Sequence, residues 1–135
     1  MNSIFELGSA IYSPKVPASQ EFYNKYKSTF GKPIQGGHGI APAYESVYIL
    51  VEAIERAGSL DPDAIVAELK KTDRKGVMGR VRYDEGNQAV YGTDPNENAI
   101  GLVFQWTEDG QRKIVFPESV AEAKIQLPPG LKSLK

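Results

Sequence analysis

The chain has 135 residues, of which 41% are hydrophobic, so it is long enough for one ordinary globular domain with a packed core. Its 16 basic and 17 acidic residues give a formal charge of −1 and form no basic stripe, which argues against nucleic acid as a partner. There is no cysteine, and no apolar run approaches the roughly 20 residues that a membrane-spanning helix needs.

The first third of the chain predicts an extended segment followed by a helix. Residues 4–12 form a short apolar run broken by Gly8, which indicates a strand or extended segment. Aromatic side chains then recur at spacings of three and four, with Ser19 as the expected N-cap and Gly31 as the stop. The glycine-rich residues 36–39 are too flexible for a regular element and predict a first linker.

Two further helices are predicted after this linker. Residues 42–57 form the strongest helical pattern, and Gly58 closes it. The charged side chains of this helix, Glu45 among them, are expected on the solvated side. Its expected buried face consists of apolar side chains at helical spacing: Tyr44, Val47, Tyr48, Val51 and Ile54. Asp61 is expected to cap the next helix. The expected buried stripe of that helix consists of Ile65, Val66 and Leu69.

The pattern changes from helical to alternating after Gly76. Residues 77–83 alternate between two faces, which predicts a strand with one partly wet face, and residues 84–87 predict a turn. Polar turn formers, a glycine and a proline in residues 88–98 predict a loop that is the second linker.

The last part of the chain predicts a β-hairpin and a tail. Residues 100–106 and 113–116 are rich in strand-forming side chains, and Gly110 supplies the left-handed conformation of the turn between them. Trp106 is expected to cover one face of the sheet. The tail has one weak helical stretch at residues 120–125 and is otherwise expected to lie extended over the surface.

Residues able to perform catalysis are scarce. His38 is the only histidine, and the chain has neither a cysteine nor a Gly-x-Ser-x-Gly turn, which argues against a nucleophilic triad. Metal-ligand spacing is absent as well, so neither a metal nor another cofactor is expected. The adjacent Asp84 and Glu85 would point apart at a strand end, and a solvated turn is the favoured reading. Residues 36–39 lack the Lys-Ser/Thr of a phosphate-binding loop. An enzyme is therefore not expected.

Tyr44 is the aromatic side chain that best suits a ligand contact. It lies in the first turn of its helix, beside the flexible linker, where a ring can project into a cleft. The favoured alternative is that Tyr44 packs in the core with Tyr48, one turn further along, while the hydroxyl groups reach the surface. The sequence leaves both readings open.

The order of these elements resembles a known family. The motifs that carry the resemblance are residues 22–33, 43–59, 67–70, 76–79, 83–87, 103–106 and 115–117. Together they are similar to the type I periplasmic binding proteins, and more specifically to the branched-chain amino-acid receptors of ABC transporters. Each motif alone is weak, but their order and spacing extend over nearly the whole chain.

The resemblance implies an α/β chain that forms roughly the last third of a two-lobed receptor. The implied divisions are the end of a second-lobe segment, a crossover hinge, first-lobe helices and strand, a last crossover, and a second-lobe hairpin with tail: residues 1–35, 36–41, 42–86, 87–99 and 100–135. The implied hinge residues are Gly36, Gly37, Gly39, Asn87 and Gln88.

The resemblance also implies a function. The chain would belong to a solute-binding component that captures an amino acid, or an aromatic or organic acid, in the cleft between the lobes and delivers it to a membrane permease. The expected location is the periplasm or the cell surface. His38 and Tyr44, at the two ends of the loop beside the cleft, are the implied ligand contacts. The alternative is a small-molecule sensor or regulator that uses the same fold.

The resemblance finally implies partners within the receptor itself. The first residues show no signal-peptide pattern, and the resemblance implies that the preceding two thirds of the family's sequence are not part of this chain. The remainder of the receptor is therefore an expected partner, and weak ligand binding by this chain alone is expected. Self-association is expected too, because apolar faces made for missing strands would be exposed.

Overall fold

The computed structural model describes residues 5–9, 13–34 and 39–127. Within these residues the helices are α1 (Pro17–Phe30), α2 (Ile40–Ala57) and α3 (Pro62–Leu69). The strands are β1 (Phe5–Ser9), β2 (Asp73–Gly76), β3 (Gly79–Arg82), β4 (Tyr91–Gly92), β5 (Ala99–Trp106) and β6 (Arg112–Phe116).

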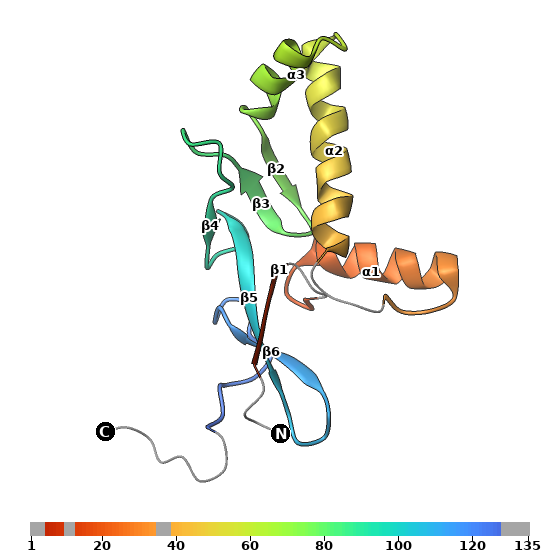
Figure 1. Cartoon of the computed structure of the whole chain (residues 1–135). Helices are drawn as coiled ribbons and strands as arrows, with labels where there is room; N and C mark the ends of the chain where they lie inside the picture. Colours follow the sequence, from red (N-terminus) through yellow and green to blue (C-terminus); the bar gives the residue numbers. More distant parts are fainter. Residues whose placement is uncertain (1–4, 10–12, 35–38, 128–135) are drawn as a thin grey trace.

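The long strand β5 joins two parts of one sheet (Figure 1). Its first residues, Ala99 and Ile100, pair with β3 and β4, whereas the residues from Gly101 onward pair with β1 and β6. We call the part with α2, α3 and strands β2 to β4 region one. Region two contains β1, β6, most of β5 and the segment that follows β6. In Figure 1, α1 lies where the two regions meet, near the start of α2.

Each region has its own apolar cluster. Cluster one, in region one, consists of Ala41, Ile49, Val77, Met78, Val81 and Ala99, with Phe22, Tyr44 and Leu69 packed against it. Cluster two, in region two, consists of Val16, Ile100, Leu102, Phe104, Ile114 and Val120. Helix α1 contacts both, because Val16 directly before it belongs to cluster two and Phe22 within it packs against cluster one.

Helix α1 begins earlier than the sequence predicted. Val16 is in the N-cap position and Pro17 occupies the first turn, where a missing backbone N–H costs nothing. The predicted cap at Ser19 is wrong, because this side chain is buried inside the first turn and its hydroxyl accepts a hydrogen bond from the Ser13 backbone N–H at 3.0 Å. The stop is as predicted: Gly31 has a φ of 68°.

Helix α2 buries a different face from the one predicted. It begins at Ile40, earlier than the predicted start at residue 42, and it ends before Gly58 as expected, with a φ of 58° at that glycine. However, the buried side chains are spaced by four, and two of the four are alanines: Ala41, Glu45, Ile49 and Ala53. The predicted apolar face is largely exposed, with Val47 at 60% and with Tyr48 and Val51 also exposed. Small side chains let the β2–β3 turn approach the helix closely, and this decides which face is covered.

Helix α3 is capped as predicted but is less buried than expected. The Asp61 carboxylate accepts a hydrogen bond from the Ala64 backbone N–H at 3.0 Å. Ile65 and Leu69 are half-buried, while Val66 is exposed, so the predicted buried stripe is wrong as a whole.

Strand β2 was missed by the sequence analysis. It pairs antiparallel with β3, and Val77 and Met78 in the tight turn between them are buried in cluster one. Its residues Asp73, Arg74 and Lys75 are charged, so no apolar alternation marks it. The predicted loop at 88–98 also contains a short strand, β4, which pairs with β5 in parallel.

The predicted hairpin is confirmed and the predicted helix in the tail is wrong. Strands β5 and β6 pair around a turn in which Gly110 has a φ of 75°. Residues 120–125 contain no helix. Instead, the Gln105 side chain donates to the Gln126 carbonyl at 2.6 Å and accepts from its N–H at 2.9 Å, which fixes this segment against the sheet.

Candidate functional site

Tyr44 lies in a stack of rings at the junction of the two regions. Its ring centroid is 4.4 Å from that of Phe22 on α1 and 4.8 Å from that of Tyr48, one turn further along α2. The Arg74 guanidinium on β2 lies 4.8 Å from the centre of the Tyr48 ring. The stack therefore connects three elements that are far apart in the sequence.

A small cavity of about 150 Å³ opens beside this stack. Helix α1 lines it with one face: Ala18, Glu21, Phe22 and Lys25. Helix α2 and the β2–β3 turn supply the other walls: Tyr44, Glu45, Arg74, Lys75, Gly76 and Val77. We call this cavity the junction pocket. An apolar cavity of roughly this size holds a benzene molecule, so the pocket has room for one small side chain.

Glu45 forms a buried, charged wall of the junction pocket. Its side chain is 1% exposed and accepts hydrogen bonds from the Arg74 side chain and, at 2.6 Å, from the Val77 backbone N–H. These donors compensate for the loss of hydration that a buried carboxylate suffers. At Gly76 an added Cβ would overlap the Glu45 carboxylate, so only glycine leaves the space that the carboxylate occupies.

The Tyr44 hydroxyl is a neutral hydrogen-bonding group. A hydrogen bond with the Tyr48 side chain, together with burial, raises the pKa of Tyr44 to about 12. Tyr44 is therefore protonated at neutral pH and its hydroxyl can donate as well as accept. An aromatic face, a phenol hydroxyl and nearby charged groups suit the recognition of a small molecule that has both apolar and polar parts.

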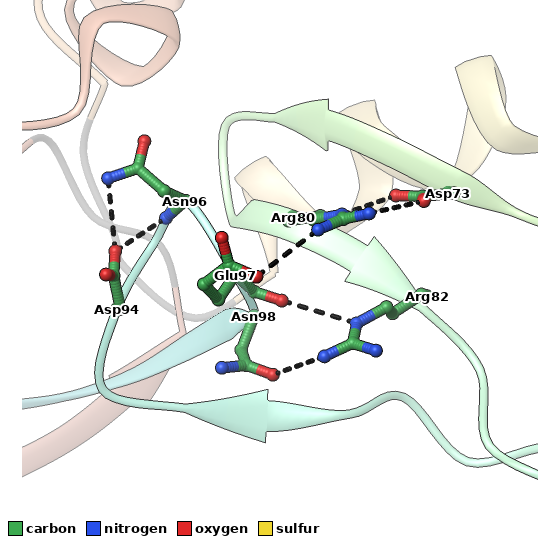
Figure 2. A network of polar contacts seen from close by, with 7 residues as sticks. All are labelled: Asp73, Arg80, Arg82, Asp94, Asn96, Glu97 and Asn98. Atoms are coloured by element: carbon green, nitrogen blue, oxygen red, sulfur yellow. Dashed lines mark hydrogen bonds and ion pairs between the residues drawn. The ribbon is translucent and has the colours of Figure 1, made fainter.

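A second polar cluster lies on β3 and the segment before β5 (Figure 2). Arg80 donates to both carboxylate oxygens of Asp73, at 2.7 Å each, and contacts Glu97 at 3.4 Å. Arg82 donates to the Glu97 carbonyl at 3.3 Å and to the Asn98 side chain at 3.1 Å. The Arg80 guanidinium lowers the pKa of the Asp73 carboxyl. These partners satisfy one another, so the cluster fastens the chain to β3 and offers no site.

A larger hollow of about 1030 Å³ is lined by residues 93–94, which follow β4, and by residues of the segment 115–125 in region two. Helices α1 and α2 contribute nothing to its lining, so it is separate from the junction pocket. In the part of the chain that the structure describes, no three His, Cys, Asp or Glu side chains are grouped to hold a metal ion, and no helix is long and apolar enough to cross a membrane.

The predicted site residues are only partly described. Tyr44 packs against cluster one and also lines the junction pocket, and its role as a ligand contact stays a prediction. His38, Gly36 and Gly37 lie outside the described residues. Gly39 is the exposed N-cap residue of α2, where an added Cβ would meet no atom within 4 Å. The predicted role of Gly39 as a hinge stays a prediction.

The other predicted hinge residues lie in a tight turn of region one. Asn87 has a φ of 60°, and Gln88 exchanges hydrogen bonds with Asp84: the Gln88 N–H donates to the Asp84 carboxylate at 2.9 Å and the Gln88 carbonyl accepts from the Asp84 N–H at 2.9 Å. A bridge between Tyr83 and Ala89 extends this turn. Their role as a hinge also stays a prediction.

Of the residues that line the junction pocket, the sequence analysis singled out only Tyr44, and it did not foresee the parts of Phe22, Glu45 and Arg74. Phe22 was predicted only as one of the aromatic side chains on one face of its helix, and Glu45 as a solvated charge. The signal that was available is the spacing of four that Glu45 shares with Ala41, Ile49 and Ala53. A charge in a row of small and apolar positions indicates a buried, paired group.

A family model described as periplasmic binding protein matches residues 6–110, which is more than half of the chain. Leu/Ile/Val-binding protein homolog 7 from Brucella melitensis is 28% identical over 123 residues, which cover 88% of this chain and 29% of that protein. The protein of the same name from Brucella suis gives the same identity and coverage. The chain thus spans 29% of the length of the curated relatives it matches.

Solved structures show the same fold. Leucine-binding protein LivK from Thermotoga maritima is 28% identical with a TM-score of 0.60, covering 80% of this chain and 29% of that one. A provisionally named branched-chain amino acid ABC transporter from Silicibacter pomeroyi has a TM-score of 0.73 at 18% identity, covering 91% of this chain and 33% of that one. At that identity the likeness concerns the fold alone, and it confirms the predicted fold class. The chain belongs to the periplasmic binding protein family, and its two regions are part of the two-lobed type I fold.

Proposed function

We propose that this chain is the C-terminal part of an extracytoplasmic receptor of an ABC transporter, which captures a small molecule between two lobes without changing it chemically. The observation that carries the proposal is the family match over residues 6–110. The family is one of solute-binding proteins and not of enzymes, so no catalytic step is proposed.

In this proposal the junction pocket is one wall of the ligand cleft. Regions one and two then belong to different lobes, and residues 36–41 and 87–99 act as crossovers between them. Support comes from the separate apolar clusters of the two regions and from a pocket lined by α1 on one side and α2 on the other. Tyr44 and His38 are proposed as ligand contacts.

The proposed ligand is an amino acid with an apolar side chain. The relatives named above include proteins whose names refer to leucine, isoleucine and valine. The pocket is consistent with this class, because Phe22, Tyr44 and Val77 offer apolar surface. Lys25, Lys75 and Glu21 line the same pocket and suit the carboxylate and the ammonium group of an amino acid.

The proposed partners are a membrane permease and the remainder of the receptor. Exposed apolar side chains on α2, namely Val47, Leu50 and Val51, favour a surface that another part of the receptor covers. Without that cover, the same surface favours self-association of this chain.

A titration with a panel of small molecules tests the proposed ligand class. We expect L-leucine, L-isoleucine and L-valine to shift NMR signals of residues lining the junction pocket in this chain, while D-glucose shifts none. We also expect binding roughly a hundredfold or more weaker than in a receptor that has both lobes, because a cleft buries a ligand only when both walls are present. Binding of glucose, or of no amino acid, would contradict the proposed ligand.

A further inference from the structure

Arg74, on the wall of the junction pocket, contacts two carboxylates and one aromatic ring with the same guanidinium group. It lies on β2 and its guanidinium donates to Glu45 through Nε and to Glu52 through Nη1. The same group lies over the Tyr48 ring, 4.8 Å from its centre. A planar guanidinium holds two carboxylates in fixed directions while it stacks flat on a ring, whereas an ammonium group is a compact point charge without this planar geometry.

Glu45 gives this arrangement a fixed anchor. Its carboxylate is enclosed between α2 and the β2–β3 turn, where the Val77 N–H binds it and Gly76 leaves it room. A buried carboxylate has few alternative positions, because each would leave it without donors. The hydrogen bond to this buried carboxylate therefore fixes the position of the Arg74 guanidinium.

Of the three rings, Tyr48 is the one that depends on Arg74, because Phe22 and Tyr44 also pack against cluster one. Tyr48 is 40% exposed, so its ring is held chiefly by the guanidinium on one side and by Tyr44 on the other. Tyr44 in turn contacts Phe22 of α1. A change in the position of Tyr48 is thus transmitted to the two rings that line the pocket.

We propose that Arg74, anchored by Glu45, is a positioning residue that sets the Tyr48–Tyr44–Phe22 ring stack at the junction pocket and thereby the affinity for the ligand. The part that concerns affinity rests on the proposed function, whereas the part that concerns the rings does not. It follows that lysine cannot replace Arg74, although it keeps the charge.

The test compares three variants of this chain by NMR. Arg74→Lys keeps the positive charge but loses the planar set of guanidinium donors. Tyr48→Leu removes the ring under the guanidinium and leaves the ion pair of Arg74 with Glu45 in place. Glu52→Gln is the matched control, because it removes the negative charge of only the more exposed of the two carboxylate partners of Arg74. The first readout is the set of nuclear Overhauser contacts between the Tyr44 and Phe22 rings, which needs no ligand. The second is the affinity for L-leucine per folded molecule.

We expect Arg74→Lys and Tyr48→Leu to weaken the Tyr44–Phe22 ring contacts and to lower leucine affinity roughly fivefold or more. Glu52→Gln should keep the ring contacts and change affinity by no more than about twofold. Because Tyr48 is exposed, Tyr48→Leu is expected to fold even if Arg74→Lys does not.

Two results would overturn the proposal. Unchanged ring contacts in both test variants would show that Arg74 does not set the rings, and altered rings with unchanged leucine affinity would show that they do not matter to the ligand. A failure of the unaltered chain to bind leucine would instead count against the proposed ligand, and the ring contacts would still decide whether Arg74 positions the stack.

Discussion

Regions one and two are held together in different ways. In region two, cluster two is entirely apolar and its members alternate along β5: Ile100, Leu102 and Phe104. In region one, cluster one contains small side chains such as Ala41 and adjoins the ion pair of the buried Glu45 with the half-buried Arg74. A large apolar side chain contributes about 1.5–3 kcal/mol when buried, whereas a buried ion pair loses in hydration much of what it gains in attraction.

This difference separates stability from the candidate site. The large, fully buried apolar side chains of cluster two are in region two, whereas the buried Glu45 carboxylate is in region one, on the wall of the junction pocket. Buried charged groups that contribute little net stability but fix the position of neighbouring side chains are what a binding site requires. The predictions that follow test this comparison, beginning with the largest effect.

The largest expected effect is in region two. Phe104 is 1% exposed, and Phe104→Ala should lower the free energy of unfolding by about 3–5 kcal/mol, because it removes buried contacts and leaves a cavity. Urea denaturation of this chain measures it. Leu7→Ala, on the same sheet but at a side chain that is 74% exposed, should change stability by no more than about 0.5 kcal/mol. Similar losses in the two variants would mean that cluster two is not the apolar core described here.

The next effect is in region one, at the approach of the β2–β3 turn to Glu45. Gly76→Ala should cost about 1–3 kcal/mol, because the new methyl group overlaps a buried carboxylate that has no room to move. Gly101→Ala is the control, since its Cβ would meet no atom within 4 Å. We expect that variant to be as stable as the unaltered chain or slightly more so. A neutral Gly76→Ala would show that Glu45 is not confined.

A smaller effect is expected at the start of α3. Asp61→Ala should lower the free energy of unfolding by about 1 kcal/mol, because the Ala64 N–H loses its acceptor. Asp61→Asn keeps an acceptor in the same place and should lose at most a few tenths of that amount. If asparagine and alanine were equally destabilising, the charge of Asp61, and not the cap, would be what stabilises the helix.

The smallest effect concerns pH. The pKa of Tyr44 is about 12 in the folded chain, above its ordinary value of 10.0, so the folded state keeps this proton where the unfolded state loses it. The contribution to stability is complete below pH 10 and is lost as the pH rises towards 12. Between pH 10 and pH 12 the thermal unfolding temperature should therefore fall less steeply with pH for Tyr44→Phe than for the unaltered chain. Tyr91→Phe, at an exposed tyrosine, should leave the slope unchanged.

The elements of region two could be predicted from sequence for a physical reason. Strand β5 is buried on one face, so its apolar side chains alternate with a period of two, and Gly110 marks the turn. The order of motifs along the chain also predicted the family correctly, because spacing is retained where single residues change.

The junction pocket could not be predicted in the same way. The sequence shows that α2 has one bulky apolar face and one face with two alanines, an isoleucine and a charge, and the bulky face was expected to be buried. Which face is covered depends on the β2–β3 turn, and β2 is charged and gives no strand signal. The partnership of Glu45 with Arg74 joins residues far apart in the chain and follows from this packing alone. The contact between the Phe22 and Tyr44 rings likewise depends on how α1 packs against α2.

The measurement that tests the account most directly is the affinity of folded Tyr44→Ala for L-leucine, by NMR titration beside its thermal stability. We predict a loss of about 1–3 kcal/mol in binding free energy, because Tyr44 lines the pocket and the alanine removes both its ring and its hydroxyl. Tyr91→Ala, at a tyrosine outside the pocket lining, should bind leucine as the unaltered chain does. If Tyr44→Ala lowered only the thermal stability and left the dissociation constant of the folded protein within about twofold, Tyr44 would be a core residue and the junction pocket would not hold the ligand.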